Sequence, residues 1–192
     1  MEKVRYLGSI IQEDCEVDGD VNNRIQDGWC KWRNASGVIF DNMVQDKVKG
    51  KFYRTAIRSA MLYGSECWAI KRHQEHKMDV TEMRMLRWMS GYTLKDRIRN
   101  DYIRERVGVA PISEKMVENC LRWYGHVQRR ELDEPVRRVD QMVEDPYIRK
   151  RGRPKRTLNE VVQRDLSAKG LLPGMTYDRA KWRRMTHVAD LT

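Results

Sequence analysis

Apolar residues recur every three or four positions along most of the chain, and this spacing is typical of helices with one buried face. The first such stripe contains Val21, Ile25, Trp29 and Trp32. Asp20 directly precedes the stripe and can accept a hydrogen bond from a free backbone N–H, as N-cap residues do. The pattern predicts a helix that begins after Asp20 and fades near residue 36.

A second helix is predicted from Asp46, as its N-cap, to about Gly64. Its apolar rows are Val48, Phe52 and Ala56, with Tyr53, Ile57 and Met61 alongside. Further helices are expected over residues 74–90, 100–107, 113–127, 134–144, 157–170 and 176–188. Glycines that can adopt the left-handed conformation of a helix C-terminus follow three of them, at positions 91, 108 and 170.

Two of these helices carry further local signals. Thr157 and Glu160 have the spacing of a capping box, which predicts a helix start at that point. In the last helix, Trp182, Met185 and Ala189 fall at i, i+3 and i+7 and are expected to share the buried face.

The stretch VRYLGSII (4–11) differs from the rest because it is short, apolar and strand-like. The acidic stretch EDCEVDGD (13–20) follows it and predicts a loop or hairpin tip. The fold class expected is therefore mainly α, a helical bundle with a short N-terminal strand or hairpin. Three regions are predicted: 1–20 with the strand and acidic loop, 21–145 with the main bundle, and 146–192 with a basic linker and small helical segment.

The composition of the chain indicates the cellular compartment in which the protein is expected. No apolar run is long enough to span a bilayer, and no signal-peptide pattern is found. The four cysteines lie far apart without a CxxC pair, which favours a reducing compartment. We expect a nuclear or cytoplasmic protein, neither secreted nor bound to a membrane.

The formal net charge of +10 indicates affinity for phosphate backbones, although a solvated surface of mixed charge would account for it equally well. The densest basic segment is RKRGRPKRT (149–157). Arg-Gly-Arg-Pro has the form of an AT-hook, an extended segment whose arginines enter a narrow minor groove. Contact with phosphates alone, or an exposed linker without a ligand, remain alternatives. The candidate binding residues here are Arg149, Lys150, Arg151, Gly152, Arg153, Pro154, Lys155 and Arg156.

The sequence predicts no catalytic residue, no cofactor and no metal site. Asp18 and Asp20 lie in a loop-like stretch without the rigid strands that a two-metal centre requires. His73, His76 and Cys67 could supply three ligands, but no fourth is evident. No phosphate-binding loop or nucleophile–histidine signature is found.

Four segments carry a family resemblance through their sequences and their order along the chain: MLYGSECWAIK (61–71), TEMRMLRWMSGYTLKDRIRNDYIRERVGVAPI (81–112), ENCLRWYGHVQRR (118–130) and RGRPKRTLNEVVQRDL (151–166). Together they resemble the C-terminal part of the polyprotein of LINE-type (non-LTR) retrotransposons, most closely the plant copies. In that family this region follows the catalytic palm of the reverse transcriptase.

The resemblance implies that Tyr6, Leu7 and Gly8 match the primer-grip segment, with partner strands in a palm upstream of residue 1. The helices from about residue 21 to 107 would resemble the thumb, which packs on the template–primer duplex. Its candidate phosphate contacts are Lys47, Lys49, Lys51 and Arg54, with Arg97 and Arg99. The catalytic x-Asp-Asp signature of the family is absent from this sequence.

The leading hypothesis is a nucleic-acid-binding fragment of a LINE-type reverse transcriptase that lacks the palm and binds an RNA–DNA or DNA duplex. Three alternatives stay open. The chain could be a working part of the polymerase when a palm is supplied elsewhere. It could be a domesticated helical protein that binds DNA through the RGRP segment or a partner through its Trp- and Met-rich surface. It could also be a non-functional remnant of a decayed element.

Overall fold

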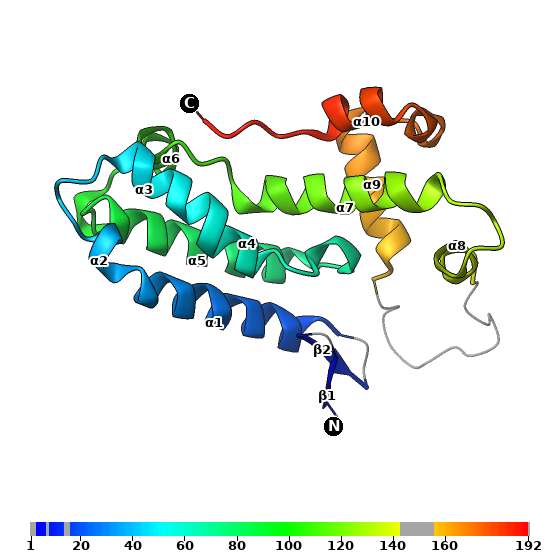
Figure 1. Cartoon of the computed structure of the whole chain (residues 1–192), viewed down its shortest axis with the longest axis horizontal. Helices are drawn as coiled ribbons and strands as arrows, with labels where there is room; N and C mark the ends of the chain where they lie inside the picture. The colour runs from blue at the N-terminus through cyan, green and yellow to red at the C-terminus, as the bar shows by residue number, and fades with distance from the viewer. Residues whose placement is uncertain (1–2, 7, 14–15, 143–155, 192) are drawn as a thin grey trace. The chain divides into compact units, whose positions relative to one another are not determined.

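The computed structural model describes residues 3–6, 8–13, 16–142 and 156–191. The chain is mainly α-helical with a two-stranded N-terminal hairpin, which confirms the predicted fold class (Figure 1). It divides into two units. Unit 1 comprises Met1–Ser65, Lys71–Met116 and Val188–Thr192, and unit 2 comprises Glu66–Ile70 and Val117–His187. The boundary predicted near residue 145 lies within unit 2.

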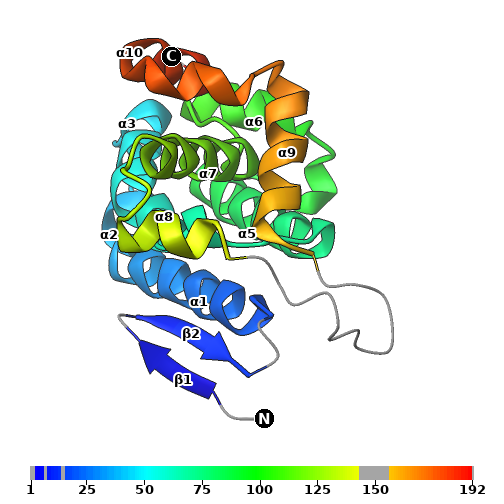
Figure 2. The ribbon, with the colours of Figure 1, turned by 90° about the vertical axis from the view of Figure 1, so that its right-hand side faces the viewer.

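The N-terminal segment of unit 1 folds back on itself as a hairpin. Strand β1 (Lys3–Tyr6) runs antiparallel to β2 (Ser9–Gln12), and Val4 lies opposite Ile11 (Figure 2). Gly8, in the turn, has a φ of 83°, which an L side chain rarely adopts. The hairpin forms within this segment, and the partner strand expected upstream of residue 1 stays a prediction.

Helix α1 (Asp18–Asn34) begins earlier than predicted and holds the hairpin. Asp20 lies inside the helix rather than at its N-cap, and its buried carboxylate accepts a hydrogen bond from the backbone N–H of Ile10 at 3.1 Å. Arg24, one turn on, donates to the carbonyl of Gly8 at 2.8 Å. The capping assignment for Asp20 was wrong because this carboxylate binds a distant backbone group instead of its own helix.

The other helices of unit 1 pack around a core of long apolar side chains. They are α2 (Ser36–Ile39), α3 (Asp46–Phe52), the π-helical turn η1 (Tyr53–Ile57), α4 (Arg58–Met61), α5 (Arg72–Met89), α6 (Asn100–Val107) and the start of α7 (Ile112–Gln128). Helix α1 packs on η1, α4 and α5, while α3 packs on α6. Met78, Met85 and Leu86 of α5 are fully buried.

The helix predicted from Asp46 to Gly64 forms with a π-helical turn in its middle. Tyr53, Ile57 and Met61 are fully buried, as their spacing predicted, but Val48 is 54% exposed. Val48 lies in α3, before the π turn, and the residues of α3 that are buried are Lys49 and Gly50. The buried face of α3 is therefore displaced from the predicted row that starts at Val48.

A buried carboxylate joins four parts of unit 1. Glu82 of α5 is fully buried and accepts hydrogen bonds from the Tyr53 hydroxyl at 3.1 Å and from the backbone N–H of Ile112 at 2.9 Å. The guanidinium of Arg104 on α6 also donates to it. Burial raises the pKa of Glu82, while the positive charge and hydrogen bond of Arg104 act against that rise.

The C-terminal residues of the described chain return to unit 1. Arg58 donates two hydrogen bonds, at 2.8 and 2.9 Å, to the two carboxylate oxygens of Asp190. The backbone N–H of Ala110 donates to the same carboxylate at 3.1 Å. Burial alone would raise the pKa of Asp190, but these hydrogen bonds and the Arg58 charge hold it below its ordinary value.

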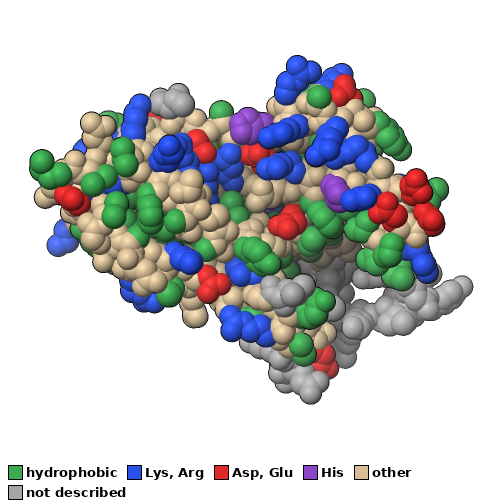
Figure 3. Space-filling model, viewed as in Figure 1, with side chains coloured by type: hydrophobic (Ala, Val, Ile, Leu, Met, Phe, Trp, Pro, Cys, Tyr) green, Lys and Arg blue, Asp and Glu red, His purple; other side chains and the backbone are tan. Residues whose placement is uncertain are grey.

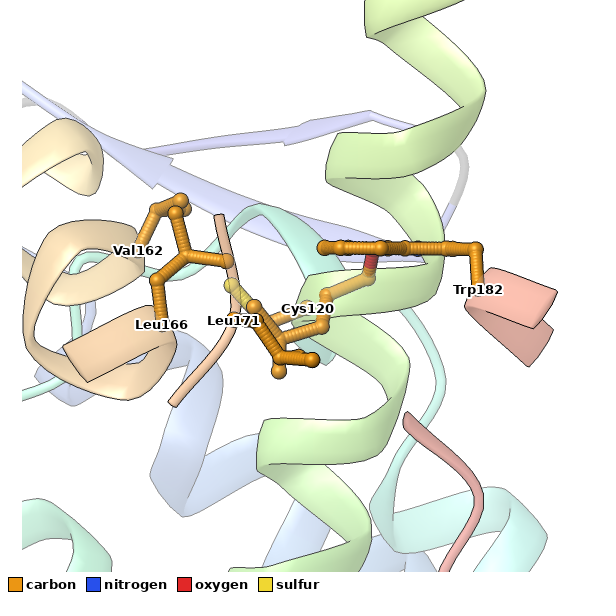
Figure 4. Packing of buried hydrophobic residues seen from close by; sticks show 6 residues of the cluster. Cys120, Val162, Leu166, Leu171 and Trp182 are labelled. Carbon is orange, nitrogen blue, oxygen red and sulfur yellow. The ribbon is translucent and has the colours of Figure 1, made fainter. Parts of the chain in front are cut away.

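Unit 2 contains most of α7 together with α8 (Pro135–Asp140), α9 (Leu158–Lys169), the 3₁₀ turn η4 (Pro173–Tyr177) and α10 (Arg179–Thr186). Its core consists of Cys120, Leu121, Val162, Leu166, Leu171 and Trp182 (Figure 4). The capping box prediction is confirmed at its N-cap, because Thr157 accepts from the backbone N–H of Glu160 at 3.3 Å.

The last helix is shorter than predicted. Residues 173–177 form η4, and Asp178 then caps α10 by accepting from the backbone N–H of Lys181 at 2.9 Å. Trp182 is buried as expected, but Met185 is 38% exposed and Ala189 lies beyond the helix. The predicted stripe was wrong at these two positions: Met185 lies on the exposed side of α10, and Ala189 lies past its end at Thr186.

We expect Glu82→Gln to destabilise unit 1 by about 3–5 kcal/mol, because it leaves the buried Arg104 charge without its counter-ion. Urea denaturation followed by circular dichroism measures the loss. Glu105→Gln, at an exposed position on α6, is the matched control and should unfold like the wild type. Glu82→Leu combined with Arg104→Met should recover only part of the stability, because the Tyr53 hydroxyl and the Ile112 N–H still lose their acceptor. A wild-type midpoint for Glu82→Gln would contradict this account.

Deleting residues 1–12 should lower the thermal midpoint by no more than about 4 °C. The apolar side chains on the outer face of the hairpin are already exposed: Val4 by 61%, Tyr6 by 62% and Ile11 by 56%. The deletion exposes the side chains of Asp20 and Arg24 to water. Nε of Arg24 lies 3.8 Å from Oδ1 of Asp20, so the two side chains can still form an ion pair. A thermal melt followed by circular dichroism tests this, and a much larger fall would show that the hairpin covers the core.

Candidate functional site

A hollow on unit 2 is lined mainly by basic and aromatic side chains of α7 and α10. Its volume is about 460 Å³, and its lining residues are Glu66, Asn119, Arg122, Trp123, His126, Arg129, Arg179, Trp182 and Arg183. A second hollow of about 430 Å³ is lined by His126, Arg129, Arg130 and Arg179. A third, of about 550 Å³, is lined by Arg179, Ala180, Arg183 and Arg184. We call these three hollows together the arginine groove.

Helical spacing places these side chains along the groove. Arg122 and His126 are four apart on α7, Arg129 directly follows the end of that helix, and Arg179 and Arg183 are four apart on α10. Residues three or four apart lie on the same helix face. Figure 3 shows Lys and Arg side chains gathered over α10 and the adjoining part of α7.

Trp182 holds α10 against α7 at the floor of the groove. Its indole N–H donates to the carbonyl of Leu121 at 3.0 Å, and its ring lies over Gly125. A Cβ at position 125 would lie 2.3 Å from Nε1 of Trp182. Only glycine allows this approach, so Gly125 sets the depth to which the indole packs.

The electrostatics of the groove favour an anion. Arg129 donates to the carbonyl of Thr176 at 2.7 Å, which fixes its guanidinium in place. Burial, with the nearby positive charge of Arg179, holds the pKa of Arg129 below its ordinary value. Glu66 is the acidic residue in the lining of the first hollow, and no acidic residue lines the second or third. Bound phosphate would relieve the repulsion between the two guanidinium groups.

The groove also contains an aromatic pair. The rings of Trp123 and His126 are stacked, with centroids 5.5 Å apart and planes 26° apart. Arg130 lies beside the pair, with its Nε 3.3 Å from Nε2 of His126. His126 therefore lines the groove together with Arg130.

The basic residues predicted as phosphate contacts at the start of the second helix differ in their exposure and contacts. Lys47 and Lys51 are exposed, whereas Lys49 is only 5% exposed. Arg54 donates to the carbonyl of Gly108 at 2.6 Å, and its Nε lies 3.8 Å from the carboxylate of Asp190. Lys47 and Lys51 are thus the two members of this cluster whose amines are exposed.

The other predicted site residues are placed only in part. Tyr6 is exposed on β1 and Gly8 lies in the hairpin turn. Leu7 and the basic residues 149–155 lie outside the described residues, while Arg156 is half-buried just before α9. Arg97 and Arg99 are exposed.

The described residues were also searched for reactive and metal-binding groups. Within residues 3–6, 8–13, 16–142 and 156–191, no three His, Cys, Asp or Glu side chains lie close enough to hold a metal ion. Asp18 was considered above as a metal ligand. Its Oδ1 lies 3.2 Å from Nε2 of His73. Burial raises the pKa of Cys120 to about 12, so its thiol is protonated at neutral pH. In the same ranges, no helix has the length and apolar character needed to cross a bilayer.

The sequence contained a partial signal for the arginine groove. Within LRWYGHVQRR (121–130), basic and aromatic residues share one helical face, and DRAKWRRM (178–185) repeats that pattern. Each segment alone reads as a solvated helix face. The groove depends on the contact between Trp182 and Leu121, which are 61 positions apart and which no local pattern connects.

Comparison with known proteins gives one informative similarity. The chain is 25% identical over 129 residues to an uncharacterised transposon-derived protein of Caenorhabditis elegans, F52C9.6. The matched region covers 65% of this chain and 46% of that protein, so the chain spans less than half the length of its relative. No protein-family model matches the chain, and no solved structure matches it. The similarity indicates a transposon origin.

Gly125→Ala should destabilise unit 2 by about 1–3 kcal/mol, because the added methyl group forces the Trp182 indole away from α7. Urea denaturation measures the change. Gly174→Ala is the matched control, since a Cβ at that exposed position meets nothing within 4 Å. Equal stabilities for the two variants would show that α10 does not depend on this contact.

Proposed function

We propose that this chain is the nucleic-acid-binding, post-palm part of a LINE-type retrotransposon reverse transcriptase and that it binds backbone phosphates through the arginine groove. The four family-like segments and the similarity to a transposon-derived protein support the origin. The observation that carries the binding function is the groove itself, where arginines from α7 and α10 line adjoining hollows.

The chemistry of these side chains suits phosphate. A guanidinium presents a planar fork of N–H donors that matches two phosphate oxygens, and it stays protonated at any physiological pH. The repulsion between Arg129 and Arg179 gives a reason for an anion to bind between them. Such contacts bind the backbone of any sequence, and they weaken with salt because counterions compete for the phosphates.

The arrangement of the hollows favours a polymer over a single anion. Arg179 lines all three hollows, and Arg129 and Arg183 each line two of them. The cationic surface is therefore continuous along the groove. A chain of phosphates can contact it at several points, while an isolated phosphate can use only one.

The basic segment at residues 149–156 gives a second phosphate-binding element in this proposal. It joins α8 to α9, two helices of unit 2, and six of its eight residues are Lys or Arg. Its contacts would add to those of the groove. Whether its Arg-Gly-Arg-Pro core reads the minor groove is a separate property, which a comparison of A·T-rich with mixed duplexes tests.

In this proposal the chain binds nucleic acid and does not itself catalyse polymerisation. The x-Asp-Asp signature that holds the catalytic metals in the family is not in the sequence. Polymerisation would need a palm supplied elsewhere, either in the same polypeptide or in a partner. The chain would then position the template–primer relative to that palm.

An interaction module is the second candidate function, and the aromatic cluster of unit 1 favours it. The rings of Trp29, Trp32 and Trp88 contact one another with centroids 5.7 Å apart, and Phe40 contacts Trp32 at 5.0 Å. Trp88 is 49% exposed and Phe40 is 53% exposed, so part of this cluster faces solvent. A protein partner bound there would be held by apolar contact, and its affinity would depend little on salt.

Arg179→Gln combined with Arg183→Gln should weaken binding to labelled oligonucleotides and reduce the salt dependence of that binding. Each lost phosphate contact removes about 0.7 from the slope of log K against log salt for a single strand and about 0.9 for a duplex. Fluorescence anisotropy at about 50 mM and 200 mM salt measures this, with single-stranded, duplex and RNA–DNA hybrid probes.

Arg72→Gln combined with Arg84→Gln is the matched control, because it removes the same charge from two exposed arginines of α5 in unit 1. Binding that the two pairs of substitutions weaken equally would reflect net charge alone and would contradict a groove in unit 2. Binding that is absent for all three probes at low salt would contradict the proposed function as a whole.

A further inference from the structure

We infer that the arginine groove takes unpaired nucleotides, with a base stacked on the Trp123–His126 pair, and therefore prefers single-stranded nucleic acid to a duplex. This inference rests on the proposed function and adds to it the strandedness of the ligand and the residue that recognises the base. A substitution or a modified probe can remove base stacking while phosphate contact remains, so the two interactions can be tested separately.

The first support is the position of Trp123. It is half-buried on α7 and lines the same 460 Å³ hollow as Arg122, Arg129, Arg179 and Arg183. Most half-buried tryptophans simply complete a core. The described core of unit 2, however, is built from Trp182 and aliphatic neighbours, with Tyr124 rather than Trp123 packed against it. Trp123 is thus an aromatic side chain in the wall of a cationic hollow.

The second support is the pairing of the two rings. With planes 26° apart and centroids 5.5 Å apart, Trp123 and His126 form a two-ring stack within the lining of the hollow. An aromatic platform beside backbone-binding arginines is the usual arrangement of proteins that bind single strands, because every base has a flat face to stack. Stacking of this kind needs no particular base sequence.

The third support is the size of the hollow. Its volume of about 460 Å³ falls within the ~300–1,000 Å³ range of pockets that enclose a ligand of nucleotide size. A duplex presents its bases already stacked inside the helix, so one would have to be flipped out before it could meet Trp123, at a cost in stacking and pairing. An unpaired strand has no such cost.

The test compares three labelled probes on the full chain by fluorescence anisotropy: oligothymidylate, an abasic oligomer of the same length, and a hairpin duplex. The abasic oligomer has the phosphates without the bases. We expect oligothymidylate to bind roughly 5–150-fold more tightly than the abasic oligomer, the gain that corresponds to one base stacked on an aromatic side chain. The duplex should bind more weakly than oligothymidylate.

Trp123→Leu should bring the affinity for oligothymidylate down to that for the abasic oligomer and leave the abasic affinity unchanged. Trp123→Phe should keep most of the preference, and it serves as the second variant if Trp123→Leu fails to fold. Trp88→Leu, which removes a half-exposed indole from unit 1, is the matched control and should bind both oligomers like the wild type.

The failures of the two proposals are distinguishable. Equal, salt-dependent binding of oligothymidylate and the abasic oligomer by the wild type would overturn base stacking while leaving phosphate binding intact. Tighter binding of the duplex would overturn the preference for single strands in the same way. Absence of binding to all three probes would overturn the proposed function and this inference with it.

Discussion

The structure of unit 1 depends on one buried negative charge. Glu82 lies in the core, and its carboxylate is satisfied by donors from the π turn, from α6 and from the first residue of α7. A buried charge is costly unless each of its partners is in place. The arrangement therefore specifies more than stability: helices that shifted along one another by a turn would leave the Glu82 charge or the Arg104 charge unpaired. The methionine-rich core around it could accommodate such shifts, because Met side chains adapt to many packings.

Unit 2 is organised by a different principle. Its core is apolar, and the indole of Trp182 fixes α10 to α7 through the space that Gly125 leaves open. That contact brings two sets of arginines, each ordinary on its own helix, to the sides of one groove. Like charges held close together are unfavourable in the unbound protein, so the apolar contact beneath them stabilises an arrangement that electrostatics alone would disperse. A bound polyanion would offset this repulsion, so the surface is suited to binding one.

Local signals in the sequence predicted most helices because their causes are local. The Thr157 cap and the glycines at positions 91, 108 and 170 all take the expected roles, with the glycines at positive φ. What the sequence could not show depends on residues far apart in the chain. Asp20 was expected to cap its own helix and instead accepts from Ile10, while Val48 is exposed and its neighbours Lys49 and Gly50 are buried. The groove itself joins residues about 60 positions apart, whose proximity no periodicity encodes.

The return of Asp190 to Arg58 has a consequence for how the protein is made. Unit 1 contains residues 1–65, 71–116 and 188–192, so the main part of unit 2, residues 117–187, is encoded before the last segment of unit 1. Because a ribosome releases the chain from its N-terminus onward, unit 2 leaves the exit tunnel before unit 1 has received its closing segment. A further 132 residues must therefore be synthesised after Arg58 before its carboxylate partner, Asp190, is present. A premature stop codon between residue 116 and Asp190 would deprive the first unit, and not only the second, of a charge that holds it together.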